Sequence, residues 1–320
     1  MTAAFAAAPP AFAPADQALV DLLDHLARRD YAFTAPTPST HSLVSERKGR
    51  ARPGDLRDIL GWNLPFREAD LPADLGRLLQ AAEAVERQAD GSWRCRVRVA
   101  SLDGRLHVHS ALGEDPHAVF LGPDSYRFVR LLKSVLGRDA RFGRAVDIGA
   151  GAGVGALALA AAAPGAEVFA ADINPEALRF AAINASHAGL NLDLAEGAGL
   201  DPVAGVFDLI VTNPPYIAGS GGRVYRDGGG ALGAELSLKW TADAVDRLAP
   251  GGRMILYTGS AIVDGRDGVR EALETLAVER KLDLSYEEID PDVFGSTLRQ
   301  SAYREAERIA VIGAVLTAPV

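Results

Sequence analysis

The sequence has few of the residues and segments on which several protein classes depend. Its 320 residues include one cysteine, Cys95, which excludes a disulfide framework, a zinc cluster built on cysteines and a cysteine-ligated iron–sulfur site. A lone cysteine fits a reducing, cytoplasmic location. The longest central apolar run, Ala156 to Pro164, is far shorter than the roughly 20 residues of a membrane-spanning helix. The six histidines have no companions at metal-ligand spacing, so we expect no metal site.

An excess of positive charge is also absent. The net charge is −9 at pH 7 and the isoelectric point is about 5.2, which argues against a broad basic surface for nucleic acid. Residues 1–115 carry a net charge of −2, and residues 116–320 carry −7. The one basic run, Arg47 to Arg52, lies in a loop flanked by Pro and Gly. We read it as a solvated loop, with a small contact to nucleic acid or a partner as the alternative.

Composition divides the chain into three parts. Residues 1–15 contain eight alanines and three prolines but no basic start or continuous apolar core, so we expect a disordered leader rather than a signal peptide. Residues 16–117 are expected to form a smaller N-terminal domain that recognises the substrate. Residues 118–320 are expected to form the catalytic domain.

The N-terminal part mixes helical and strand patterns. Leucines between Leu19 and Leu26 share one helical face, with Asp16 as the expected cap. Residues 93–99 alternate between apolar and arginine side chains, and a second strand follows the turn at Asp103-Gly104. Helices followed by a hairpin predict an α+β module that resembles a winged helix. We expect the arginine face, Arg94 to Arg98, to be the wet side of the hairpin, with a contact to an acidic partner as the alternative.

From Gly143 onward, short apolar strands alternate with helices. This pattern predicts an α/β fold with a doubly wound, mainly parallel, Rossmann-like sheet of seven strands. The last two strands lack a helical crossover and are expected to pair antiparallel. The predicted strands are residues 144–148, 167–172, 192–196, 207–212, 253–257, 283–289 and 308–317.

The first strand leads into a glycine-rich turn that suits a nucleoside ligand. Gly149, Gly151 and Gly153 let the backbone approach a ligand closely, and the next helix start supplies free N–H groups. A dinucleotide fingerprint from Gly149 requires a third glycine where Val154 stands. Asp147, before the turn, suits a ligand with an ammonium group better than a pyrophosphate. A frame that starts at Gly151 leaves the dinucleotide alternative open.

The second strand ends at Asp172. A carboxylate at that edge can accept hydrogen bonds from both ribose hydroxyls. Ile173, the next residue, can pack on the face of an adenine ring. Both residues are therefore candidates for cofactor binding.

The fourth strand runs into Asn213-Pro214-Pro215-Tyr216. Its carboxyl end lies beside the first strand, so Asn213 should face the cofactor. The Asn213 amide oxygen and the Pro214 carbonyl can hold both hydrogens of a planar NH₂ group, while Tyr216 forms an aromatic wall. These groups are neutral, so their chemistry is orientation and polarisation rather than deprotonation by a strong base.

Together these motifs resemble those of a known enzyme family. The glycine turn resembles motif I of class I S-adenosylmethionine (SAM)-dependent methyltransferases, and the tetrad resembles that of enzymes methylating amino groups in glutamine, adenine or guanine. Residues 118–317 look most like the HemK-like N5-glutamine methyltransferases that act on polypeptide release factors. The resemblance implies SAM as cofactor, with S-adenosylhomocysteine as product.

The resemblance also implies roles for residues outside the two motifs. It places Glu196 and Gly197, at the end of the third strand, against the adenine ring. Asp124, in a loop that closes over the cofactor, is expected with Pro215 and Tyr225 to contact the substrate.

The chain also departs from that family. Arg226 stands where the release-factor enzymes usually have an acidic residue, and Tyr257-Thr258-Gly259 lacks the usual glutamate. The first 115 residues do not resemble the all-helical N-terminal domain of those enzymes.

We therefore expect an N-methyltransferase that acts on a glutamine side chain of a protein, such as a translation factor. The first alternative is methylation of a base amino group in RNA or DNA. A non-catalytic SAM-binding module and a nicotinamide oxidoreductase are the remaining alternatives.

Overall fold

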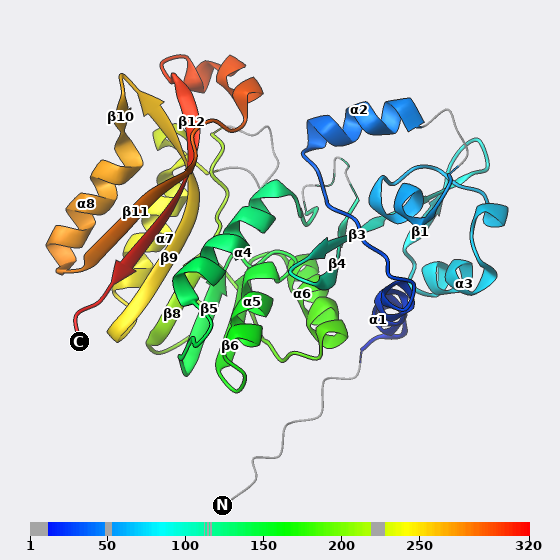
Figure 1. Ribbon diagram of the computed structural model, residues 1–320, viewed down its shortest axis with the longest axis horizontal. Helices are drawn as coiled ribbons and strands as arrows, with labels where there is room; N and C mark the ends of the chain where they lie inside the picture. The colour runs from blue at the N-terminus through cyan, green and yellow to red at the C-terminus, as the bar shows by residue number, and fades with distance from the viewer. Residues whose placement is uncertain (1–11, 49–52, 112, 114, 116, 219–227) are drawn as a thin grey trace, which may run out of the picture. The chain divides into compact units, whose positions relative to one another are not determined.

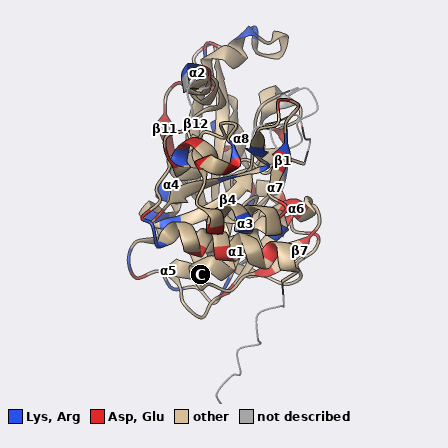
Figure 2. Cartoon of the chain, turned by 90° about the vertical axis from the view of Figure 1, so that its right-hand side faces the viewer, with Lys and Arg blue, Asp and Glu red and all other residues tan. Residues whose placement is uncertain are grey.

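The structure is a computed structural model that describes residues 12–48, 53–111, 113, 115, 117–218 and 228–320 (Figure 1). The chain forms two compact units. The N-terminal unit comprises Met1–Ala111 and Ile183–Leu190, and the C-terminal unit comprises Leu112–Ala182 and Asn191–Val320. Charges of both signs are interspersed along the elements in Figure 2. Within the described residues, no helix is long and apolar enough to cross a membrane, and no cluster of His, Cys, Asp or Glu is placed to hold a metal ion.

The N-terminal unit combines short helices with two hairpins. The leucine face between Leu19 and Leu26 is buried, as the helical pattern predicts. The first helix begins at Pro14 rather than behind the expected cap Asp16, because the fixed φ of proline suits the first helical position. The elements are α1 (Pro14–Ala27), α2 (Pro38–Lys48), η1 (Arg57–Gly61), η2 (Glu68–Asp70), α3 (Ala73–Ala81), β1 (Val85–Arg87), β2 (Trp93–Cys95), β3 (Val97–Leu102) and β4 (Arg105–Ser110).

The predicted hairpin is formed by β3 and β4, which pair antiparallel. Asp103 and Gly104 at its turn have φ values of 51° and 72°, the positive values that a two-residue type I′ turn requires. The chain before it is less regular than predicted. A bend at Arg96 separates β2 from β3, and β2 pairs instead with β1.

The prediction that the arginine face is solvent-exposed holds for Arg94 and Arg96, but it is wrong for the part of that face on the β3–β4 hairpin. Arg98, His107 and His109 on that face are all buried. The Arg98 Nε donates to the Gly61 carbonyl at 2.8 Å, and the Arg98 guanidinium carbon lies 5.7 Å from the centre of the Phe33 ring. Segments distant in sequence supply this cover, so the local alternation could not reveal it. Arg98 is consequently not a surface contact for an acidic partner.

The C-terminal unit contains the predicted α/β sheet. The strand order is β11-β12-β9-β8-β5-β6-β7, with the two-residue β10 paired to β9. Strands β5 to β9 pair parallel, and β12 pairs antiparallel with β11, as predicted. β12 also pairs antiparallel with β9, which the sequence did not indicate. The elements are α4 (Pro123–Leu136), β5 (Arg144–Ile148), α5 (Val154–Ala162), β6 (Glu167–Asp172), α6 (Pro175–Ala188), β7 (Asp193–Glu196), β8 (Phe207–Thr212), η4 (Ala231–Gly233), α7 (Glu235–Val245), β9 (Leu248–Val263), β10 (Arg266–Asp267), α8 (Gly268–Arg280), β11 (Asp283–Asp290), η5 (Gly295–Arg299), η6 (Ser301–Tyr303) and β12 (Arg308–Thr317).

The fifth predicted strand is much longer than its local pattern indicates. The apolar run predicts a strand over residues 253–257, whereas β9 extends from Leu248 to Val263. The extension has a partner, because β12 pairs with β9 continuously from Arg253 to Ile262. A strand end fixed by a distant strand cannot be read from local hydrophobicity. The long β9 carries Tyr257 and Gly259 within the sheet rather than in a loop after it.

Three buried histidines make the N-terminal unit sensitive to acid. Burial lowers the pKa of His41 and of His107 to about 4 each, and burial followed by the Arg98 charge lowers the pKa of His109 well below its ordinary value. The unfolded chain binds these protons near pH 6.5, whereas the folded unit binds those of His41 and His107 only near pH 4, and the pKa of His109 is likewise well below its ordinary value. The free energy of unfolding should therefore fall with pH below 6.5, by up to about 1.4 kcal/mol per pH unit for each histidine.

We expect urea unfolding at pH 7, 6 and 5 to report this loss through the fluorescence of Trp62 and Trp93 in a Trp240→Phe background. The substitution His107→Gln should flatten the pH dependence, because it removes one suppressed protonation. His117→Gln, which changes an exposed side chain, should leave the slope unchanged. A stability that does not fall between pH 6.5 and 5 would contradict the assignment.

Candidate functional site

Two loops meet at the carboxyl ends of the parallel strands, where β5 and β8 end side by side. Ile148 pairs with Thr212, and the Thr212 hydroxyl donates to the Ile148 carbonyl at 2.7 Å. The glycine turn follows β5 directly, and Asn213 follows β8. From β5 the sheet continues to β6 on one side and to β8 on the other. This reversal of strand order is where open α/β sheets bind ligands.

The glycine turn leaves open space at Gly151. A Cβ on Gly149 would lie 2.9 Å from the Trp240 ring, and one on Gly153 would lie 2.9 Å from the Cβ of Ala181. A Cβ on Gly151 would meet nothing within 4 Å, although its φ of 53° disfavours any side chain. The first and third predicted glycines therefore permit close packing, while Gly151 forms an open backbone cradle.

Asp147 lies beneath the turn rather than in this cradle. Its side chain is buried and accepts a hydrogen bond at 2.8 Å from the Ala156 amide in the first turn of α5. Burial raises the pKa of Asp147 to about 8. Asp147 thus braces the start of α5, and its predicted contact with a charged ligand stays a prediction.

Asp172 links the end of β6 to the glycine turn. One carboxylate oxygen accepts from the Gly151 amide and the other from the Asn174 amide, both at 2.9 Å. Burial raises the pKa of Asp172, while these two amides act in the opposite direction. Each oxygen keeps a further lone pair, so the carboxylate is held in a fixed position and can still accept from ribose hydroxyls.

The other predicted nucleoside contacts gather around Asp172. Glu196 pairs with Asp172 in the β6–β7 ladder, and the Gly197 amide donates to the Asp172 carbonyl at 3.0 Å. Ile173 next to them is 55% exposed, which is unusual for a large aliphatic side chain. An exposed Ile173 beside a fixed carboxylate fits the apolar face and ribose of an adenosine.

Sequence reasoning missed Trp240 of α7. Its ring would be 2.9 Å from a Cβ on Gly149, and its Nε1 would be 3.4 Å from a Cβ on Gly199. The Trp240 side chain therefore packs beneath the glycine turn and against the loop after β7. No motif surrounds Trp240 in the sequence, and only the folded sheet brings α7 to this position.

The tetrad follows the last residue of β8 directly, beside the glycine turn that follows β5. Pro214 is buried, whereas Asn213 and Pro215 are partly exposed. Among the described residues, which leave out 219–227 shortly after the tetrad, none forms a hydrogen bond with the Asn213 side chain. Pro215 has no N–H, so no hydrogen atom on the following residue competes for the Pro214 carbonyl.

Tyr216 lies in an aromatic cluster. The centre of its ring is 6.5 Å from that of Tyr257 and 5.9 Å from that of Phe294. The Tyr216 ring also covers Gly259 of β9, where a Cβ would lie 2.5 Å from its Cδ2 atom. Burial and the nearby Asp124 carboxylate raise the pKa of Tyr216 well above its ordinary value. The ring therefore has a fixed position, and the hydroxyl stays neutral.

Asp124 lies close to this cluster, in the first turn of α4 rather than in the expected loop before the helix, and its contact with the substrate stays a prediction. The Tyr257 hydroxyl donates to Asp124 Oδ1 at 2.8 Å, and an Arg127 nitrogen lies 3.5 Å from the same oxygen. Arg127 also pairs with Asp290 at 2.9 Å. β9 therefore presents the Tyr257 hydroxyl from the middle of the strand, and α4 supplies the carboxylate that it meets. Tyr225, the remaining predicted contact, lies outside the described residues.

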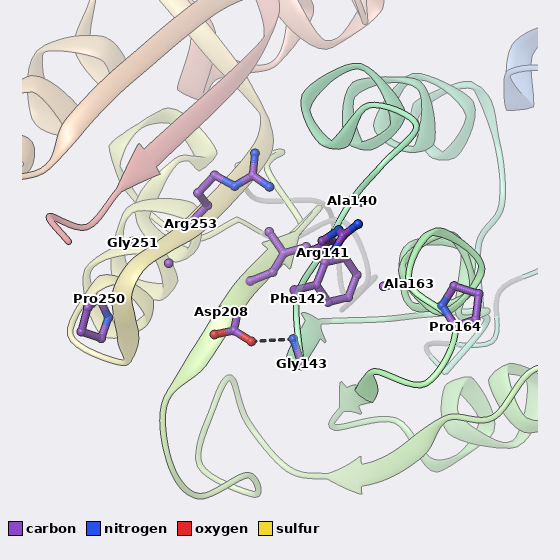
Figure 3. A pocket seen from close by; sticks show the side chains of 12 residues that line it. Ala140, Arg141, Phe142, Gly143, Ala163, Pro164, Asp208, Pro250, Gly251 and Arg253 are labelled. Carbon is purple, nitrogen blue, oxygen red and sulfur yellow. Dashed lines mark hydrogen bonds between the residues drawn. The ribbon is translucent and has the colours of Figure 1, made fainter.

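A pocket of about 600 Å³ lies at the opposite edge of the sheet (Figure 3). Gly143, Asp208 and Arg253 line it, near the starts of the parallel ladders of β5, β8 and β9. The Asp208 carboxylate accepts from the Gly143 amide at 2.6 Å, and Arg253 donates to the Val135 carbonyl. These polar groups hold neighbouring segments together. The predicted site residues lie at the opposite ends of these strands, which are their carboxyl ends.

Comparison with known proteins agrees with this arrangement. The family model described as "Methyltransferase small domain" matches residues 127–276. A release factor glutamine methyltransferase of Deinococcus radiodurans is 33% identical over 227 residues, which cover 68% of this chain and 76% of the relative. Another, from Rhodospirillum rubrum, is 35% identical over 204 residues, which cover 60% of this chain and 62% of that relative.

Solved structures support the fold alone. Trm5b from Pyrococcus abyssi superposes with a TM-score of 0.51 at 15% identity, covering 77% of this chain and 68% of that chain. The glycine turn, the Asp172 carboxylate and the exposed Ile173 fit the parts of a SAM molecule. SAM is the cofactor of this methyltransferase family. The chain belongs to the HemK-like class I SAM-dependent methyltransferases, the family of the release factor glutamine methyltransferases.

Proposed function

We propose that the protein methylates the side-chain amide nitrogen of a glutamine in a protein substrate, with a release factor as the first candidate. The partly exposed Asn213, held next to the glycine turn by the β5–β8 pairing, carries this proposal. The names of the Deinococcus and Rhodospirillum relatives support glutamine as the acceptor and a translation factor as its bearer. Residues 16–117 are proposed to recognise the substrate, and a cytoplasmic location stays a prediction that the buried free thiol of Cys95 fits.

In this mechanism the chain orients the acceptor. Bound SAM supplies an electrophilic methyl group on a sulfonium. The Asn213 amide oxygen and the Pro214 carbonyl accept hydrogen bonds from the two hydrogens of the acceptor NH₂, which aims its nitrogen at that methyl. Tyr216 packs on the planar amide, and Pro215 keeps the turn rigid. All of these groups are neutral, so the rate gain comes from position and polarisation.

Different residues are proposed to contact different parts of the cofactor. The Gly151 backbone cradle accommodates its methionine end near the start of α5, and Asp172 accepts from the ribose hydroxyls. Ile173 packs on one face of adenine, with Glu196 and Gly197 at the ring edge.

The charge distribution favours a protein over a nucleic acid as substrate. Residues 116–320 carry −7 of the net charge of −9, which opposes the approach of a phosphate backbone. Part of the basic run at Arg47 to Arg52 lies outside the described residues, and Arg98 is buried. An RNA base is therefore the less favoured acceptor.

The proposal is tested with radiolabelled SAM and two acceptors, an unmethylated release factor and total RNA. We expect label on a glutamine of the release factor, and a loss of about 100-fold or more in kcat for Asn213→Ala, because one holder of the NH₂ group is removed. Asn191→Ala changes an exposed asparagine and should retain full activity. Label confined to RNA, or full activity in Asn213→Ala, would overturn the proposal.

Ile173→Ala should weaken SAM binding by about tenfold in calorimetry, because it removes apolar area that the adenine would cover. Val278→Ala is the matched control, since Val278 of α8 is 80% exposed and lies outside the proposed site. Equal dissociation constants for the two variants would refute the adenine contact.

Gly259→Ala should reduce methyl transfer by at least about tenfold while leaving SAM affinity unchanged. The added Cβ would overlap the Tyr216 ring and displace the aromatic wall. Gly268→Ala meets open space and serves as the control. A Gly259→Ala enzyme with wild-type kcat/KM would show that the position of the Tyr216 ring does not matter.

A further inference from the structure

The segment between β11 and β12, residues 291–307, packs against the tetrad. The Phe294 ring centre lies 5.9 Å from that of Tyr216, with 59° between the ring planes. Phe294 is partly exposed, whereas Tyr216 is buried. Phe294 therefore extends the aromatic surface of Tyr216 outward from the reacting end of the site.

Tyr303, in the same segment, holds the backbone that follows the tetrad. Its side chain is buried, and its hydroxyl accepts from the Ala218 amide at 2.8 Å and donates to the Leu232 carbonyl at 3.0 Å. Ala218 is two residues beyond Tyr216. The backbone of Gly233 packs directly on the Tyr216 carbonyl, with no room for a Cβ. One hydroxyl thus ties together the two chain segments that border Tyr216.

Two large residues near Tyr216, one in the 291–307 segment and one in the segment that Tyr303 holds, have a backbone conformation that such residues rarely adopt. Phe294 has a φ of 55°, and Leu232, whose carbonyl Tyr303 holds, has a φ of 56°. Such conformations persist only where surrounding contacts enforce them, and they cluster at functional sites. Here the contacts that enforce them are those that position the aromatic wall.

Arg127, which lies near this wall, is already paired with carboxylates. Arg127 is shared between Asp124 and Asp290, and Asp124 also accepts from Tyr257. A cation engaged by two carboxylates is poorly placed to hold a phosphate. The apolar rings of Tyr216 and Phe294 suit a neutral planar amide and the polypeptide that carries it.

We propose that the 291–307 segment forms a second wall of the acceptor site, in which Phe294 contacts the acceptor polypeptide and Tyr303 is a positioning residue for Tyr216. The proposal rests on the proposed function, because it takes the acceptor to be a glutamine amide on a polypeptide. Phe294 contributes to binding the acceptor in ground and transition states alike. Tyr303 acts through the backbone of Ala218 and Leu232 and does not touch the acceptor.

These two roles predict different kinetic signatures with an unmethylated release factor as the probe. Phe294→Ala should raise the KM for the release factor about tenfold with little change in kcat, and Phe294→Tyr should restore it. Tyr303→Phe should lower kcat about tenfold, because the tetrad loses its fixed position while the packed ring remains. The SAM dissociation constant should stay within about twofold of wild type in every variant.

Tyr286→Phe is the matched control. Its hydroxyl donates to Asp267 at the start of α8, so the substitution removes a tyrosine hydrogen bond elsewhere in the same sheet. It should leave kcat and both affinities unchanged. A KM unaffected by Phe294→Ala, or equal losses of kcat in Tyr303→Phe and Tyr286→Phe, would overturn the second wall. If the wild-type enzyme does not methylate the release factor, the proposed function fails first, and the two failures are thereby distinguished.

Discussion

The parallel pairing of β5 with β8 is the interaction on which the site depends. It aligns Ile148 with Thr212, so the glycine turn and Asn213 begin side by side where these two strands end. The hydrogen bond from the Thr212 hydroxyl to the Ile148 carbonyl strengthens this register. A slip by one residue would turn every side chain of β8 to the opposite face and move the tetrad away from the turn. Side chains from other strands add to this site, but none of them replaces that alignment.

Local sequence was sufficient to predict the strands that build this edge. The predicted limits of β5, β6 and β8 agree with those of the structure, because buried parallel strands are continuous apolar runs that Gly and Pro interrupt sharply. The residues at their carboxyl ends, Asp172 and Asn213, were predictable for the same reason. In an open α/β sheet, chemistry gathers where such strands end.

Features that depend on distant partners were not predictable. The length of β9 is set by β12, and the burial of Arg98 is set by segments such as the one that carries Gly61. Trp240 reaches the site from α7, with no motif around it in the sequence. Periodicity reports which face of an element is apolar. It does not report which remote element will cover a polar face.

The electrostatics of the site explain why position carries the proposed chemistry. Burial raises the pKa of Asp147 to about 8, so this carboxyl adds little negative charge beneath the turn at neutral pH. Arg127 is engaged by Asp124 and Asp290, and the raised pKa keeps the Tyr216 hydroxyl neutral. The tetrad itself offers uncharged atoms, namely those of the Asn213 amide and the Pro214 carbonyl oxygen. Such atoms distinguish acceptors by the geometry of an NH₂ group, so selection among different amides must come from the walls that hold the polypeptide around it.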